Sequence, residues 1–136
     1  MIAVKYGVIL TPKEATASER LVMLYDQLHE LINEYHPEIA AVEKLFFSRN
    51  VTTALAVGQA RGVVMLCLEQ AGIQAFEYTP NEVKQAVAGY GSAQKKQMQE
   101  MVRALLALDS IPRPDDAADA LAIAITHLST KRYDLI

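Results

Sequence analysis

Three aspartates begin the last apolar segment of the chain, in the run Asp115-Asp116-Ala117-Ala118-Asp119. Asp116 and Asp119 are three residues apart, so a helix places their carboxylates on one face. One interpretation is capping, with Asp115 as the N-cap residue and the others favoured by the helix dipole. Asp119 lies one turn in, where capping no longer needs it, and the apolar run that follows is typical of a buried helix. Carboxylates crowded beside a core repel one another and favour a proton or a divalent cation.

Glu43 ends the short apolar run Glu38–Glu43, which predicts a buried strand. In open α/β sheets ligand sites gather at the carboxyl ends of strands. The alternative is a solvent-exposed acid one step past the strand. Glu43 with Asp116 and Asp119 makes an oxygen-ligand set suited to Mg²⁺, and such sets support two-metal hydrolysis of phosphodiesters.

Positive charges gather beside a glycine loop and beside a pair of aromatics. Lys84, Lys95 and Lys96 flank the loop Gly89-Tyr90-Gly91-Ser92. They are either solvated surface lysines or phosphate contacts next to a backbone that DNA can approach closely.

The aromatic pair Phe46-Phe47 lies in a polar loop with Lys44 before it and Arg49 after it. Phenylalanine usually joins a core. In this setting it is also suited to stack on an unpaired base, with Arg49 as a phosphate contact.

The expected order of elements is β, α, β, α, β, followed by helices. β-Branched and aromatic runs predict strands at Met1–Leu10, Glu38–Glu43 and Ile73–Tyr78. Periodicity and cap residues predict helices after Ser18 and ending at Pro37, at Val51–Gln70, from Thr79-Pro80 to Gly89, at Ala93–Leu108 and at Asp115–Ser129. This order indicates one α/β domain over residues 1–136 with a largely parallel sheet.

Composition narrows the class of protein. The chain has 136 residues, 51% of them apolar, a net charge of −3 and a single cysteine. A reducing, cytoplasmic setting and no membrane association are therefore expected, because a lone cysteine forms no intrachain disulfide and the longest apolar stretch, Gly62–Leu68, is too short to cross a bilayer. The acidic balance excludes binding of nucleic acid by bulk charge, so any contact must be local.

The Val51–Gln70 helix has a smooth surface made by small residues, namely Ala54, Gly58, Ala60 and Gly62. From composition, packing against another helix of the same chain is favoured over packing against a symmetry partner. His29, His36 and His127 show no zinc-ligand spacing and are expected to be surface or hydrogen-bonded histidines.

Four segments together resemble the RuvC family of Holliday-junction resolvases, in the family's order and over nearly the whole chain. They are AVEKLFFSRN, ALAVGQARGVV, FEYTPNEVKQAVAGYGSAQKKQMQEMV and IPRPDDAADALAIAITH. The resemblance implies an RNase H-like fold, a homodimer and Mg²⁺-dependent (or Mn²⁺-dependent) symmetrical nicking of four-way DNA junctions. It also implies a branch-migration helicase complex as a partner.

By position, the resemblance implies roles for individual residues. Glu43, Asp116 and Asp119 match acidic metal ligands, and Lys84 and Lys95 match basic positions that contact DNA or assist at the scissile phosphate. Phe46 matches the aromatic that stacks at the junction centre. The Ala54–Gly62 helix resembles the dimer-forming helix of the family. This resemblance favours packing of the helix against a second chain more strongly than composition alone does.

The family pattern begins with a strand ending in Asp-Pro-Gly, whose aspartate is a metal ligand, followed by a second strand. This sequence opens at what resembles the third strand, and its first aspartate, Asp26, falls inside an amphipathic helix pattern. The expectation is an N-terminally truncated sheet that lacks the first two strands, with an incomplete acidic site and an exposed strand edge.

Two hypotheses follow. The first is a junction endonuclease, and the second is a catalytically impaired chain that binds branched DNA without cutting it. A diphosphate-binding prenyl-transfer helix, suggested by the Asp-Asp-x-x-Asp motif alone, is disfavoured because such enzymes need a large all-helical cavity.

Overall fold

The computed structural model describes residues 1–44 and 51–134, with side chains described as far as Thr130. Within these ranges the chain forms helices and strands in the order α1 (Ala17–Tyr35), β1 (Ile39–Glu43), α2 (Val51–Gln70), β2 (Gln74–Tyr78), α3 (Pro80–Ala88), α4 (Lys95–Leu105) and α5 (Asp115–Asp134). The elements divide into two compact units. Unit 1 comprises Met1–Val8, Ala41–Lys44 and Phe76–Ile136, and unit 2 comprises Ile9–Ala40 and Leu45–Ala75.

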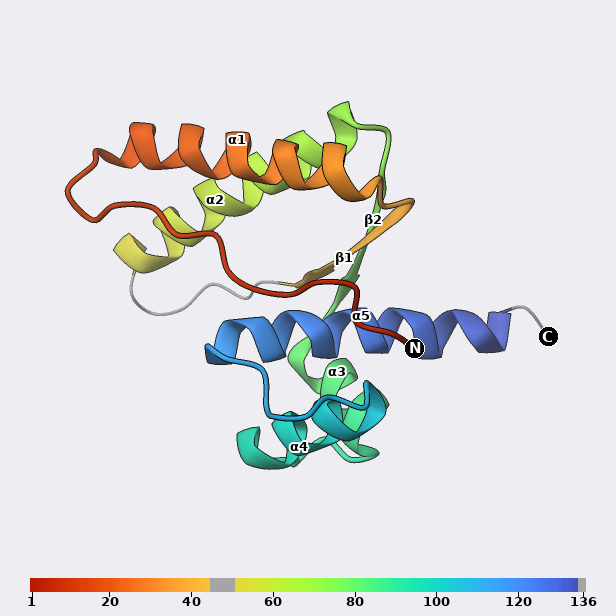
Figure 1. The fold of residues 1–136 in the computed structure, drawn as a ribbon. Coiled ribbons are helices and arrows are strands. Elements are labelled where there is room, and N and C mark those ends of the chain that lie inside the picture. Colours follow the sequence, from red (N-terminus) through yellow and green to blue (C-terminus); the bar gives the residue numbers. More distant parts are fainter. Residues whose placement is uncertain (45–50, 135–136) are drawn as a thin grey trace. The chain divides into compact units, whose positions relative to one another are not determined.

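In unit 1, α3, α4 and α5 pack on one another (Figure 1). Helix α3 begins with a capping box, in which Thr79 Oγ1 accepts the Glu82 amide and the Glu82 carboxylate accepts the Thr79 amide, with Pro80 at the first position. It ends at Gly89, whose φ of 90° is the left-handed conformation that favours glycine at a helix end. The resulting core contains Tyr78, Val83, Val87, Val102, Ala122 and Ile125.

The two strands form a two-stranded sheet within the described residues. The Lys44 amide, one residue past β1, donates to the carbonyl of Tyr78, the last residue of β2, at 2.8 Å. The carboxyl ends of the strands therefore lie side by side, as in a parallel pair connected through a helix. The strands predicted at Glu38–Glu43 and Ile73–Tyr78 are confirmed to within one residue.

The strand predicted at Met1–Leu10 is wrong, because these residues have no regular secondary structure. β-Branched residues favour an extended backbone, but a strand also needs a hydrogen-bonded neighbour. In the described part of the chain, β1 and β2 pair only with each other. Ile2, Val4 and Leu10 are consequently 87%, 80% and 77% exposed.

In unit 2, α1 packs along α2. Thr16 caps α1 in a capping box with Glu19, so the helix begins before the predicted Ser18. It ends at Tyr35, with His36 as its C-cap residue, ahead of Pro37 as predicted. Helix α2 has the predicted bounds.

The smooth surface of α2 is uncovered at Gly58 and Gly62 within the described chain, whereas Ala54 and Ala60 are half-buried. A Cβ built at Gly58 or Gly62 meets no atom within 4 Å, so the intrachain packing favoured by composition is wrong at these two positions. By length and composition alone α2 could also cross a membrane, which corrects the expectation that no stretch is long enough, and only 11% of its apolar window is buried. A single helix of this kind is weak evidence for a membrane span.

The last two helices differ in length from the prediction. Helix α4 is shorter than Ala93–Leu108 and ends before Ala107, which has a positive φ of 52°. Helix α5 begins at Asp115 and runs past the predicted Ser129 to Asp134. Its buried side includes Ala118, Ala122 and Ile125, in agreement with the predicted buried helix.

Candidate functional site

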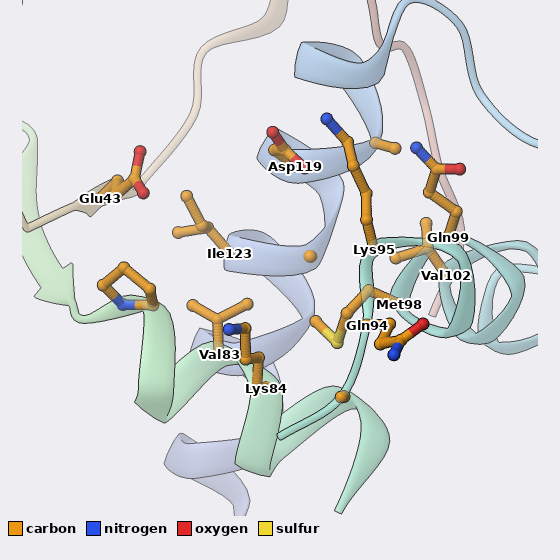
Figure 2. Close-up of a pocket in the computed structure, with 14 residues that line it drawn as sticks. Glu43, Val83, Lys84, Gln94, Lys95, Met98, Gln99, Val102, Asp119 and Ile123 are labelled. Carbon is orange, nitrogen blue, oxygen red and sulfur yellow. The ribbon is translucent and has the colours of Figure 1, made fainter. Parts of the chain in front are cut away.

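A pocket of about 480 Å³ opens among the end of β1, helices α3 and α4, and the first turns of α5, all in unit 1 (Figure 2). It combines carboxylate, ammonium and amide groups with an apolar floor. The lining residues are Glu43, Pro80, Val83, Lys84, Ala93, Gln94, Lys95, Met98, Gln99, Val102, Ala118, Asp119, Ala122 and Ile123.

Three of the predicted chemical residues reach this pocket because of where their elements begin or end. Glu43 is the last residue of β1, so its side chain lies at the carboxyl edge of the strand pair. Lys95 is the first residue of α4. Asp119 is the fifth residue of α5, one turn beyond its start. Figure 2 shows these three side chains around one opening, with Lys84 of α3 at its lower rim.

Asp119 has the most perturbed setting among the pocket acids. Partial burial raises the pKa of the Asp119 carboxyl. The Lys95 ammonium opposes this rise, whereas the Asp116 and Asp115 carboxylates add to it. A carboxylate that neighbouring acids repel gains more than an isolated one from a cation, and this is the behaviour expected of a metal ligand.

Asp116 does not line the pocket, although it is exposed one turn before Asp119 on the same helix. Across residues 1–44 and 51–134, no group of three or more His, Cys, Asp or Glu side chains is placed to hold a metal ion. The structure therefore brings two of the three predicted acids to one pocket, Glu43 and Asp119.

The donor chemistry of that pair fits one Mg²⁺ ion. Magnesium prefers carboxylate oxygens, and proteins usually bind it through one or two carboxylates while waters and substrate phosphates complete the shell. Glu43 and Asp119 supply two carboxylates from different elements.

Lys95 is held by an aspartate outside the pocket lining. Its Nζ lies 2.8 Å from Asp115 Oδ2, and Gln99 Nε2 donates to Asp115 Oδ1 at 3.1 Å. Arg113 Nη1 lies 3.7 Å from the same Oδ1. The hydrogen bond between Lys95 and Asp115 raises the pKa of the lysine and lowers that of the aspartate. Both side chains are solvent-exposed, 61% and 45%, so the ion pair contributes little to stability.

The other predicted contact residues are placed differently. Lys84 lines the pocket, whereas Lys96, next to Lys95 on α4, does not. Phe46 and Arg49 lie outside the described residues. In the glycine loop, glycine at position 91 has a structural explanation, because a Cβ there would overlap the Asn81 side-chain amide.

Sequence reasoning missed the partners of these residues. Asp115 was expected to act as an N-cap, but its carboxylate joins the starts of α4 and α5. Gln94, Met98 and Gln99 were not singled out, and helix periodicity from Lys95 was the signal that could have placed Met98 and Gln99 beside it. His127 is buried and hydrogen-bonded, and a hydrogen-bonded setting was one of the two expected for the histidines.

Comparisons with known proteins agree with this arrangement. The model of the family described as "Crossover junction endodeoxyribonuclease RuvC" matches residues 1–127. Curated relatives of that name include one from Roseiflexus sp., 63% identical over 121 residues, covering 89% of this chain and 72% of the relative. Another, from Thermomicrobium roseum, is 55% identical over 130 residues, covering 96% of this chain and 80% of the relative.

Two solved structures are also similar. One is RuvC of Thermus thermophilus, with a TM-score of 0.86 and 40% identity, covering 94% of this chain and 77% of the other. The other is T. thermophilus RuvC in complex with Holliday junction substrate, with a TM-score of 0.85 and 37% identity over 93% of this chain and 77% of the other. This likeness confirms the predicted RNase H-like α/β fold, and with the family match it shows that the chain belongs to the RuvC family of crossover junction endodeoxyribonucleases.

Proposed function

We propose that this chain is a Mg²⁺-dependent endonuclease that resolves four-way DNA junctions by paired symmetrical nicks in recombination and repair, with Mn²⁺ as an alternative ion. The observation that supports this most is the pocket of unit 1, where two carboxylates, Glu43 and Asp119, face two ammonium groups, Lys84 and Lys95. Carboxylates that hold a divalent cation beside lysines that bind a phosphate are the parts that phosphodiester hydrolysis needs. The T. thermophilus relative solved with a Holliday junction suggests the same class of substrate.

Each site residue has a proposed task. Glu43 and Asp119 would hold the cation, and Asp116, one turn before Asp119 on α5, would be a third carboxylate near it. The ion supplies an activated water and neutralises charge on the phosphate. Lys95 exchanges Asp115 for the scissile phosphate and stabilises its developing charge. Its exposed ion pair suits this exchange.

Residues around the pocket are proposed to fix the DNA. Lys84, Lys96 and Arg49 contact phosphates on either side of the scissile bond, which positions the strand without reading its sequence. Phe46 stacks on an unpaired base at the junction centre.

A homodimer is proposed because paired nicks need two sites and because α2 offers an uncovered surface. Val51, Leu55 and Leu66 are 74%, 63% and 53% exposed, and the described chain leaves Gly58 and Gly62 uncovered. An apolar face of this kind marks a protein interface. Relatives of the RuvC type indicate a non-membrane protein, and we propose a cytoplasmic location and a branch-migration helicase complex as a further partner.

A second candidate function is binding of branched DNA without cleavage. The observation that favours it is the lack, within the described ranges, of a group of three or more metal-ligating side chains. A site with two carboxylates holds a metal ion more weakly than one with three, while the lysines keep their affinity for phosphates.

One experiment separates the two functions. A synthetic four-way junction is incubated with the chain and Mg²⁺, and binding is measured in parallel by gel shift in Ca²⁺. Paired symmetrical nicks that disappear in Glu43→Gln support the endonuclease. Binding without nicks supports the second function, and neither binding nor nicks would overturn both.

A further inference from the structure

A buried hydrogen bond joins β2 to α5 in unit 1. The Tyr78 hydroxyl lies 2.7 Å from His127 Nδ1, and the two residues are only 7% and 6% exposed. The His127 ring also stacks at a tilt on Phe76, with ring centroids 4.6 Å apart. A hydrogen bond in such surroundings is stronger and more directional than one in water, because the local dielectric is low.

This pair is connected to Glu43 through the backbone. Tyr78 is the last residue of β2, and its carbonyl accepts the amide of Lys44 at 2.8 Å. Lys44 directly follows Glu43, so the pocket carboxylate is one peptide away from a residue that is hydrogen-bonded to Tyr78. The tyrosine thereby joins the end of β1 on its backbone side and α5 on its side-chain side.

The same pair is connected to Asp119 through a rigid helix. His127 lies eight residues after Asp119 on α5, about 12 Å along the helix axis at 1.5 Å per residue. Between them, Ala122 and Ile125 are buried in the core, so this stretch of α5 is packed rather than frayed.

We infer that Tyr78 and His127 form a positioning pair that fixes Glu43 relative to Asp119 across the pocket. Apolar packing is not directional, whereas a buried hydrogen bond between the strand and the helix fixes both distance and orientation. Metal ligands must be held to within about half an ångström, and outer partners of ligands supply that precision. This inference rests on the proposed metal-binding role of the two carboxylates.

The test compares Tyr78→Phe with a matched control, Thr126→Val. Thr126 is also buried on α5, and its hydroxyl donates to the Ala122 carbonyl at 2.8 Å within the helix, so the control loses a buried hydrogen bond that does not reach β2. Mn²⁺ binding is measured by calorimetry on the full chain without DNA, and the melting temperature of each variant is recorded. Both variants are expected to melt lower, but only Tyr78→Phe is expected to weaken Mn²⁺ binding, by about tenfold or more.

The Mg²⁺ dependence of nicking gives a second measurement. Tyr78→Phe is expected to raise the Mg²⁺ concentration for half-maximal nicking and to retain most of the rate at saturating Mg²⁺. A merely structural role would instead lower the amount of active protein at every Mg²⁺ concentration.

The outcomes distinguish this inference from the proposed function. If the unmodified chain binds no Mn²⁺, the proposed metal site fails and the positioning role fails with it. If the unmodified chain binds Mn²⁺ and Tyr78→Phe binds it as well as Thr126→Val does, only the positioning role is overturned. Should Tyr78→Phe not fold, His127→Gln, which keeps a polar group at the position, is compared with Thr126→Val by the same criterion.

Discussion

The two units of this chain differ in how far they bury their apolar side chains. In unit 1, Val102 of α4 and Ile125 of α5 are 1% and 2% exposed, and the helices that carry the pocket share one core. In the described part of unit 2, α2 buries only Cys67 and Leu68 below the surface and leaves Val51 and Leu55 exposed. The unit 1 helices thus bury their apolar side chains against one another and frame the pocket, whereas α2 leaves large apolar side chains exposed, which the proposed dimer interface would cover.

Replacing Asp119 by Asn is expected to have the largest effect and to be confined to unit 1. Loss of a metal-ligating carboxylate removes several kcal/mol of transition-state stabilisation, or roughly a thousandfold or more in nicking rate. Asp119 is largely exposed and only partly buried, so the melting temperature is expected to stay near that of the unmodified chain. Nicking rates on a four-way junction at saturating Mg²⁺ measure this.

Asp109→Asn is the matched control, because it makes the same change of charge outside the pocket lining. Equal loss of nicking in both variants would contradict a role for the Asp119 carboxylate itself.

Replacing Leu55 by Ala tests the other half of the comparison. If α2 forms the dimer interface, the variant loses roughly 1.5 to 3 kcal/mol of association free energy per leucine buried there, and the dimer dissociates at about ten- to a hundredfold higher concentration. Sedimentation equilibrium over a dilution series measures the shift. Leu128→Ala on α5 removes another half-exposed leucine and is expected to leave association unchanged. An unchanged dissociation constant in Leu55→Ala would exclude this part of α2 from the interface.

A pair of glycine substitutions sharpens the contrast in packing. At Gly91 an added methyl group overlaps the end of the exposed Asn81 side chain, which must rotate away, so Gly91→Ala is expected to destabilise unit 1 by about 0.5 to 1 kcal/mol. At Gly58, within α2, the methyl group meets nothing in the described chain, so Gly58→Ala is expected to stabilise the dissociated chain by about 0.5 to 1 kcal/mol through helix propensity. Denaturant unfolding at low protein concentration measures both. Changes of the same sign would contradict the difference between the two units.

Local rules predicted much of the fold. The Thr-Pro-x-Glu pattern before α3 specifies its start because the cap is made by residues three apart. The bounds of α2 follow from a long run rich in small residues and from Gly72 just beyond its end. The strand predicted at Met1–Leu10 was wrong for the opposite reason. Its composition favours an extended chain, but the neighbour that would make it a strand is a property of the tertiary structure.

In the candidate site, too, local features could be predicted and tertiary contacts could not. The residue types and element ends of Glu43, Lys95 and Asp119 could be predicted, because strand ends and helix starts are local features. The residues that these side chains contact could not be predicted. Asp115 lies 20 residues beyond Lys95, and His127 lies 49 residues beyond Tyr78, and no periodicity connects such positions. The family resemblance supplied roles for residues but not these contacts.

Modest effects are expected at the two capping boxes, one in each unit. Thr79→Ala in unit 1 and Thr16→Ala in unit 2 remove equivalent hydroxyls, each costing about 1 kcal/mol. Helix α3 has nine residues and α1 has 19, so the lost cap is expected to disturb α3 more, together with Lys84 in the pocket. In hydrogen exchange, protection is expected to fall throughout α3 in Thr79→Ala but only in the first turn of α1 in Thr16→Ala.

The cap of α3 also predicts a dependence on pH. Hydrogen bonds from the Thr79 backbone and side chain lower the pKa of Glu82 in the folded chain, so the unfolded chain binds its proton more tightly. The stabilisation is therefore present above the ordinary carboxyl pKa and is lost as the pH falls through the lowered value. Unfolding free energies of Glu82→Gln and the unmodified chain should differ by a few tenths of a kcal/mol at neutral pH, as expected for an exposed group, and converge in acid. A difference that persists unchanged into acid would mean that the Glu82 charge contributes nothing to the cap, and that its amide isostere fails for steric reasons instead.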